Sequence, residues 1–183
     1  AAQAAAAGCN SVAVTVKDAS GQVYFDSAQP AASGAIRTES TTAAALTAMT
    51  ASETGHLLLS TLHTVGAAKT IDRIVDVFPA NQQQQVRVQL SMVLQAVLSQ
   101  QLIPSVKGGQ VAAFEVMLVD PAIASVIREG KVHQLDNMIY AGSASGMQTM
   151  DGDILRLYNE GLITRENALM YSVNPDVLSR KLR

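Results

Sequence analysis

The apolar positions of this 183-residue chain recur with two periods, which predict both strands and helices. Near the N-terminus, the β-branched run Val12–Val16 and the run Val23–Phe25 are separated by Asp18-Ala19-Ser20-Gly21, a pattern typical of a β-hairpin. Alanine-rich stretches on either side predict helices over Ala1–Ala7 and Thr41–Ala51. This N-terminal segment is therefore expected to combine helix with one hairpin.

Residues 51–119 alternate strand-like and helix-like patterns. The continuous apolar run His56–Thr61 is typical of a strand covered on both faces. The segment Ala67–Phe78 predicts a helix that Pro79 ends, and its apolar face consists of Ile71, Ile74, Val75 and Phe78. Asn81 is a candidate cap for a long helix, whose apolar stripe consists of Val86, Leu90, Val93, Leu94, Val97 and Leu98.

A second pair of strands is predicted over Gln101–Pro104 and Val111–Val119, joined by a turn at Lys107-Gly108-Gly109. Asp120-Pro121 then starts a helix, because aspartate caps helices and proline suits their first position. Helical patterns fill the remainder and cover 121–129, 131–140, 151–160, 165–172 and 175–182. The expected fold class is α/β, with strands early and a helical bundle over residues 120–183.

Composition narrows the range of functions. The net charge is -2 and the pI is near 5.9, so no basic field attracts nucleic acid. Cys9 is the only cysteine, which excludes an intrachain disulfide and favours a reducing compartment. No apolar window is long enough to span a bilayer. Ala1–Gly8 lacks the basic flank of a signal peptide, and the chain is expected to begin inside a longer reading frame.

The most informative stretch is Glu53–Thr64, in which polar residues flank the predicted strand at both ends. His63 and Thr64 follow its C-terminal end, which in an open parallel sheet is the edge where ligands bind. A histidine there can hydrogen-bond a phosphate, or it can merely cap the following turn. His56 and His63 lie at opposite ends of the strand, so no metal site is predicted. His133 is expected on a helix surface.

Five separated blocks, in the same order, resemble the pilus retraction branch of the type II/IV secretion ATPase superfamily. The segment Glu53–Thr64, ETGHLLLSTLHT, matches the histidine box of that superfamily. The other blocks are Ala67–Pro79, Gln95–Leu102, Pro121-Ala122-Ile123 with Ile127-Arg128-Glu129, and Gly146–Asp151. The resemblance covers residues 51–183 and implies the C-terminal half of a RecA-like P-loop ATPase core, over 51–119, followed by the helical bundle, over 120–183.

The resemblance also implies a function. Members of this branch are hexamers at the cytoplasmic face of the inner membrane, where they use ATP and Mg²⁺ to disassemble pili and drive twitching motility. Their partners are further copies of themselves and the inner-membrane platform of the pilus. By position, Glu53, His56 and His63 would be catalytic residues that face the nucleotide and the subunit seam. Thr64 and Arg73 would bind the cofactor.

A second group of positions resembles the retraction motif of the family, and consists of Ala122, Ile123, Ile127, Arg128 and Glu129. Ala124 stands where the family pattern has an arginine, so the motif is intact only in part. Asp72 and Arg73 are expected to form either an ion pair at a seam or helix contact, or a solvated pair on an amphipathic helix.

The sequence lacks the phosphate loop, Gly-x-x-x-x-Gly-Lys followed by Ser or Thr, because no lysine has that context. Between Gly34 and Arg37, Ala35 stands where the family pattern has the catalytic glutamate. Lysine and Mg²⁺ supply the charge compensation for phosphoryl transfer. We therefore predict that the isolated chain hydrolyses ATP at no more than the background rate.

Two alternatives to a motor subunit follow from the sequence. The missing phosphate loop favours a non-catalytic assembly or interaction module of the same machinery. Residues 1–50 instead resemble the start of a GlcG-like, haem-binding-protein-like fold, which implies a small-ligand or haem-binding module.

Overall fold

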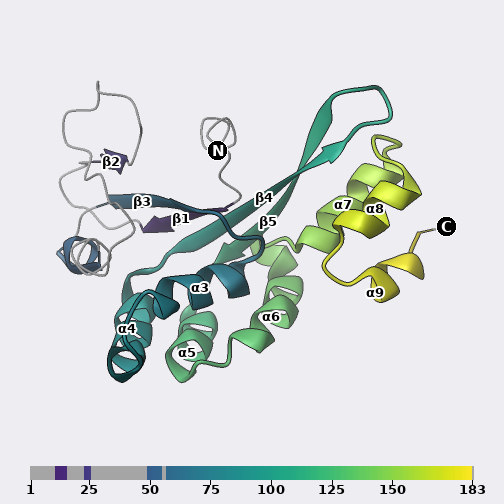
Figure 1. Cartoon of the computed structure of the whole chain (residues 1–183). Helices are drawn as coiled ribbons and strands as arrows, with labels where there is room; N and C mark the ends of the chain where they lie inside the picture. Colours follow the sequence, from purple (N-terminus) through teal and green to yellow (C-terminus); the bar gives the residue numbers. More distant parts are fainter. Residues whose placement is uncertain (1–10, 16–22, 26–48, 55–56, 183) are drawn as a thin grey trace.

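A computed structural model describes residues 11–15, 23–25, 49–54 and 57–182 (Figure 1). Its sheet has the strand order β2-β3-β1-β4-β5. The strands are β1 (Ser11–Thr15), β2 (Val23–Phe25), β3 (Leu57–Leu62), β4 (Ala96–Pro104) and β5 (Gln110–Leu118). β1 pairs antiparallel with both β3 and β4, and β2 pairs parallel with β3. The sheet is therefore mixed, and its one described parallel pair is β2–β3.

The strands β1 and β2 form where the sequence predicts them, but the predicted β-hairpin between them is wrong. β3 lies between the two strands and pairs with both of them. Short turn residues favour local pairing, but here the apolar run of β3 supplies a partner from more than 40 positions further along the chain. The predicted helix over Ala1–Ala7 and most of the one over Thr41–Ala51 fall outside the described residues, in which 49–53 are helical.

β4 and β5 form a long antiparallel hairpin whose register runs from Ala96↔Leu118 to Pro104↔Gln110. The predicted turn is confirmed, and Gly108 and Gly109 both have positive φ, which glycine adopts without strain. The predicted long helix beyond Val93 is wrong, because β4 already begins at Ala96. Val97 and Leu98 fit the helical spacing, but nine cross-strand pairs with β5 decide for the strand.

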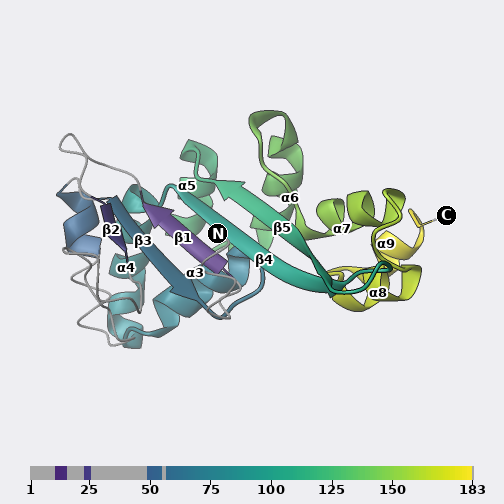
Figure 2. The same ribbon diagram turned by 90° about the horizontal axis from the view of Figure 1, so that it is seen from above.

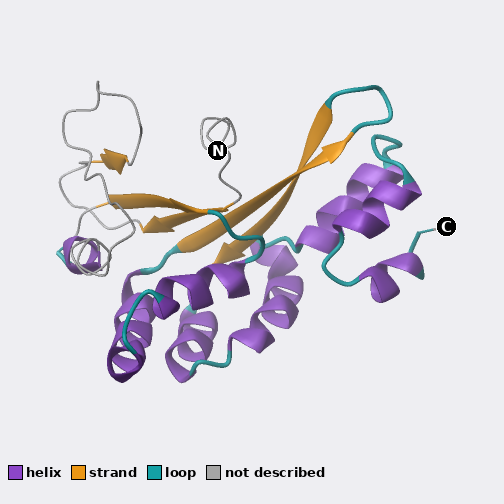
Figure 3. Cartoon of the chain, viewed as in Figure 1, coloured by secondary structure: helices purple, strands orange, loops and turns teal. Residues whose placement is uncertain are grey.

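A layer of α-helices lies on one side of the sheet, below it in Figures 1 and 3. They are α3 (Ala67–Asp76), α4 (Ala80–Val93), α5 (Pro121–Glu129) and α6 (Leu135–Ala141), and the short helices η1 (Val132–Gln134) and η2 (Gly142–Ser145) flank α6. η1 and α6 together replace the single helix predicted over 131–140. α4 begins after Pro79, so the predicted cap at Asn81 is wrong.

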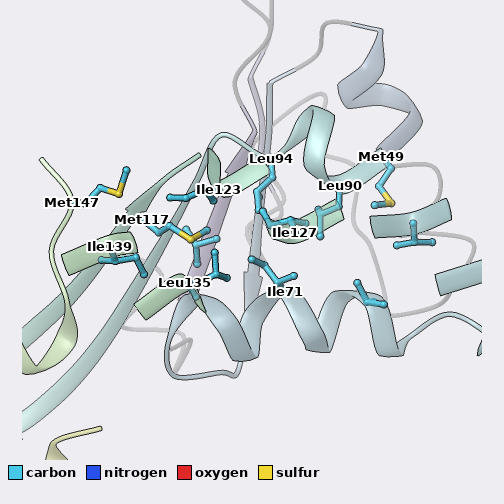
Figure 4. Packing of buried hydrophobic residues seen from close by; sticks show 14 of the residues in the cluster. Met49, Ile71, Leu90, Leu94, Met117, Ile123, Ile127, Leu135, Ile139 and Met147 are labelled. Carbon is cyan, nitrogen blue, oxygen red and sulfur yellow. The ribbon is translucent and has the colours of Figure 1, made fainter. Parts of the chain in front are cut away.

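The main hydrophobic core lies between these helices and the near ends of β4 and β5. Figure 4 shows Ile71 of α3, Leu90 of α4, and Ile123 and Ile127 of α5 turned toward one another, with Met117 of β5 beside them. Ile71, Val75 and Phe78 are buried, as the helical spacing predicts, and Ile74 is partly buried against the same cluster. Full burial of one isoleucine contributes about 1.5–3 kcal/mol, so this cluster is a main source of stability.

A second core forms at the far end of the β4–β5 hairpin (Figure 2). It is covered by α7 (Met150–Asn159), α8 (Arg165–Tyr171) and α9 (Pro175–Ser179). Ile103 and Ala113 reach it from the hairpin, and Met150 and Ile154 reach it from α7. α9 is shorter than the predicted helix over 175–182. Met147 packs in the main core and Met150 packs in the second core, so the chain passes from one core to the other between these residues. The predicted domain division at residue 120 remains a prediction.

Candidate functional site

The predicted histidine position lies in a short loop between β3 and α3. His63 follows β3 directly and is exposed to solvent. Thr64 shares a 2.8 Å hydrogen bond between its Oγ1 and that of Thr70, and Thr70 Oγ1 donates to the carbonyl oxygen of Gly66 at 2.8 Å. Gly66 has φ of 92°, which a residue with a Cβ rarely adopts. The loop 63–66 is therefore fastened to the first turn of α3.

The first backbone N–H of α3 binds a carboxylate from another part of the chain. Glu115 of β5 accepts the Ala67 N–H through Oε1 at 2.7 Å, and α3 has no side-chain cap of its own. Sequence reasoning missed Glu115. The available signal was its register, since Ala113, Glu115 and Met117 alternate along β5 on its buried face, where a charge requires a partner.

Glu115 is only 4% exposed and also reaches a second helix. Its Oε2 accepts the Met150 N–H, the first of α7, at 3.3 Å. Burial raises the pKa of Glu115 above its usual value, the two backbone N–H donors oppose that effect, and the charges of Asp136 and Asp151 add to it. The carboxylate thus sits at the positive ends of two helix dipoles.

The first turn of α7 carries further polar contacts. Thr149 caps the helix by accepting the Gly152 N–H at 3.1 Å. Asp151 accepts the N–H groups of Val173 and Asn174, at 2.6 and 2.9 Å, and so holds the turn before α9. The buried Asp153 accepts the Phe114 N–H at 2.9 Å and pairs with Arg156 at 2.7 Å. Asp153 therefore connects the hairpin to α7, and Asp151 connects α7 to the turn before α9.

A pocket of about 330 Å³ opens between α6, α7 and α9. Its lining includes Glu115, Asp136 and Asp151, with the exposed apolar side chains of Tyr140 and Val177. Within the described residues, no group of three or more His, Cys, Asp or Glu side chains has the arrangement of a metal site.

The structure separates the residues predicted to be catalytic. Glu53 is exposed at the end of the helical residues 49–53, before β3, and His63 follows β3. The six residues of β3 lie between them in the chain and span about 20 Å. His56 lies outside the described residues. The roles of these three residues remain predictions.

The setting of His63 differs from the expectation. The described side chains of β3, Leu58 to Leu62, are half-buried, and coverage of the strand on both faces remains a prediction. The end of β3 is not the edge of an open parallel sheet, since β1 runs antiparallel beside it. His63 is instead presented by its loop and by α3.

The predicted cofactor residues, Thr64 and Arg73, and the predicted ion pair of Asp72 with Arg73 lie on or beside α3. Thr64 is fixed at its N-terminal end, whereas Arg73 is exposed in its last turn. The Nη1 atom of Arg87 on α4 lies 3.8 Å from Oδ1 of Asp72, so Asp72 pairs with Arg87 and the expected pair with Arg73 is wrong.

The residues that resemble the retraction motif divide between core and surface on α5. Ile123 and Ile127 are fully buried in the main core. Ala122, Arg128 and Glu129 are exposed. Asp120 accepts the Ile123 N–H at 2.7 Å, which confirms the predicted helix start. A hydrogen bond from Lys131 lowers the pKa of the exposed Glu129. The role of this motif remains a prediction.

Comparisons with known proteins agree with this architecture. A family model described as type II/IV secretion system protein matches residues 33–167. The chain is 55% identical over 121 residues to the type IV pilus retraction ATPase PilT of Pseudomonas aeruginosa. The aligned region covers 66% of this chain and 35% of that protein. The chain is 49% identical over 133 residues to a twitching motility protein of Neisseria gonorrhoeae, covering 72% and 36%.

Solved structures give the same result. The crystal structure of the pilus retraction motor PilT with bound ADP superposes with a TM-score of 0.65 at 47% identity, over 75% of this chain and 38% of that one. The ATPase DotB of Legionella pneumophila, at 22% identity and a TM-score of 0.59, shares the fold. The α/β fold class, as the C-terminal half of a RecA-like ATPase, is therefore confirmed. The chain spans about a third of the length of these curated relatives.

Proposed function

This chain belongs to the type II/IV secretion system protein family, and we propose that it is part of a pilus retraction ATPase that couples ATP hydrolysis to pilus disassembly in twitching motility. The observation that carries the proposal is the 55% identity over 121 residues to a pilus retraction ATPase. The match of fold to a retraction motor with bound ADP supports it.

We further propose which of the predicted site residues face the nucleotide and which face the neighbouring subunit. In a ring of subunits, His63 and Thr64 face the nucleotide from the start of α3, and Glu53 lies toward the neighbouring subunit. The distance of about 20 Å along β3 supports this division, because one nucleotide phosphate cannot touch both ends of that strand. Arg73, exposed in the last turn of α3, is proposed as a further contact for the cofactor.

ATP and Mg²⁺ are the proposed cofactors, and the phosphates need a phosphate loop that the 183 residues do not contain. The isolated chain is therefore expected to hydrolyse ATP no faster than background. In the assembled motor the proposed partners are other subunits of a hexamer and the inner-membrane platform, on the cytoplasmic side. Within the described part of the chain, no helix has the length and apolar character needed to cross a bilayer.

The proposal is tested by mixing subunits. The purified chain is titrated into the full-length Pseudomonas retraction ATPase, and the ATPase rate and the mass of the ring are measured together. Entry of the chain into the ring lowers the rate, because an inserted chain brings no phosphate loop. If nucleotide contacted by His63 at the subunit seam helps to hold the chain in the ring, His63→Ala should weaken entry and with it the inhibition. His133→Ala, at an exposed histidine of η1, is the matched control.

Three outcomes are distinct. A lowered rate that depends on His63 supports a nucleotide-facing role. A changed ring mass with an unchanged rate supports the non-catalytic assembly module. No change in either quantity at excess chain, or saturable Mg²⁺-dependent hydrolysis by the chain alone, contradicts the proposal.

A further inference from the structure

On the buried face of the β4–β5 hairpin, two polar side chains lie between the two hydrophobic cores. Val97 and Met117 belong to the main core, and Ile103 and Ala113 belong to the second. Between them lie the paired residues Ser99 and Glu115, with exposed fractions of 1% and 4%. Glu115 is thus the charged group at the boundary of the two packing units.

The two oxygens of Glu115 are divided between these units. Oε1 holds the N-terminus of α3, which packs in the main core, and Oε2 holds the N-terminus of α7, which packs in the second. If one helix moves and the carboxylate moves with it, the hydrogen bond to the other helix lengthens. A hydrogen bond weakens over a few tenths of an ångström, so the positions of the two helix N-termini depend on each other.

Each helix end in turn fixes a different structure. On one side, Thr70 bonds to Thr64 and Gly66, so the loop 63–66 moves with the first turn of α3. On the other, Asp151 and Asp153 hold the turn before α9 and the backbone of β5 to the first turn of α7. Gln148 and Val116 also exchange two backbone hydrogen bonds just before α7.

We propose that Glu115 is a positioning residue that couples the loop carrying His63 to the C-terminal helices α7–α9. The inference rests on the proposed function for the role of His63 in sensing nucleotide, and Glu115 itself acts only through the two helix N-termini. A displacement of α7–α9 is then transmitted to the loop 63–66 through one side chain.

The test uses the complete chain without nucleotide, so that its outcome is independent of whether the chain binds ATP. Thr149→Ala removes the cap of α7 and leaves Glu115 in place. It is expected to shift the backbone amide NMR signals of residues 63–67 and to speed hydrogen exchange at Ala67 by about tenfold. Thr164→Ala, which removes the equivalent cap of α8, is the matched control and should leave those signals unchanged.

The second part of the test asks whether the effects of Thr149→Ala and Glu115→Gln are additive. In the Glu115→Gln background, Thr149→Ala should no longer shift the signals of residues 63–67, because the amide group cannot accept from both helices. Thermal unfolding checks that each variant is folded. If Thr149→Ala leaves the loop signals unchanged in the native background, or shifts them equally in both backgrounds, the coupling is refuted, and the first result is obtained even if Glu115→Gln does not fold.

Discussion

Replacing Asp153 by alanine tests whether buried hydrogen bonds or surface ion pairs hold the C-terminal helices to the hairpin. Asp153 is 1% exposed and makes two contacts, one to the Phe114 N–H and one to Arg156. Removing the carboxylate leaves the part-buried Phe114 N–H without this acceptor, which costs about 1–3 kcal/mol. The contact with Arg156 adds about 0–1 kcal/mol, because that side chain is 49% exposed and solvent screens its charge.

The expected loss of unfolding free energy for Asp153→Ala is therefore about 1–4 kcal/mol, or a fall in melting temperature of about 2–16 °C for a chain of this size. Arg156→Ala is the matched control and should cost no more than about 1 kcal/mol. Both values come from urea denaturation, and hydrogen exchange at the Phe114 amide reports the local effect. The reasoning fails if Arg156→Ala destabilises the chain as much as Asp153→Ala does.

Three further predictions concern stability and pH. Ile123→Ala should cost about 2–5 kcal/mol in urea denaturation because it empties part of the main core, whereas the exposed Ala122→Ser should cost under about 0.5 kcal/mol; equal costs would contradict the division of α5. Burial raises the pKa of Glu115 in the folded state, and the charges of Asp136 and Asp151 add to this effect. The contribution of Glu115 to stability is therefore complete below the unfolded pKa of about 4.5, and it is lost as the pH rises through the folded pKa. The difference in unfolding free energy between the native chain and Glu115→Gln should therefore fall with rising pH, and a flat or rising difference would refute the assignment. Gly66→Ala should cost about 1–3 kcal/mol, because its φ of 92° and ψ of 148° lie in a region that essentially only glycine adopts, and calorimetry showing no loss would exclude strain at that turn.

Local chemistry predicted the elements whose ends are set by nearby residues. Asp120 and Pro121 determine where α5 begins, and Lys107-Gly108-Gly109 determines the turn between β4 and β5, and both predictions are confirmed. The start of β4 was not predictable in the same way. Val93, Leu94, Val97 and Leu98 satisfy helical spacing, and only the pairing of Ala96 onward with β5 and β1 selects the strand.

The family was predictable from the sequence, but the setting of His63 was not. The motif around His63 indicated the family, and the structure shows that this histidine is exposed, while its role remains a prediction. Its setting depends on contacts between distant positions, namely the pairing of β1 beside β3 and the bond from Ala67 to Glu115, 48 residues away. A single sequence carries no spacing rule for such contacts.

The β4–β5 hairpin also bears on the order of folding. Its nine cross-strand pairs close over a loop of five residues, whereas β1 must find β4 across more than 80 residues of chain. We therefore expect the hairpin to form early and to provide the surface on which both cores condense. Because both cores pack on the β4–β5 hairpin, both would depend on the same nucleation event. Slow formation of the hairpin would then delay both cores.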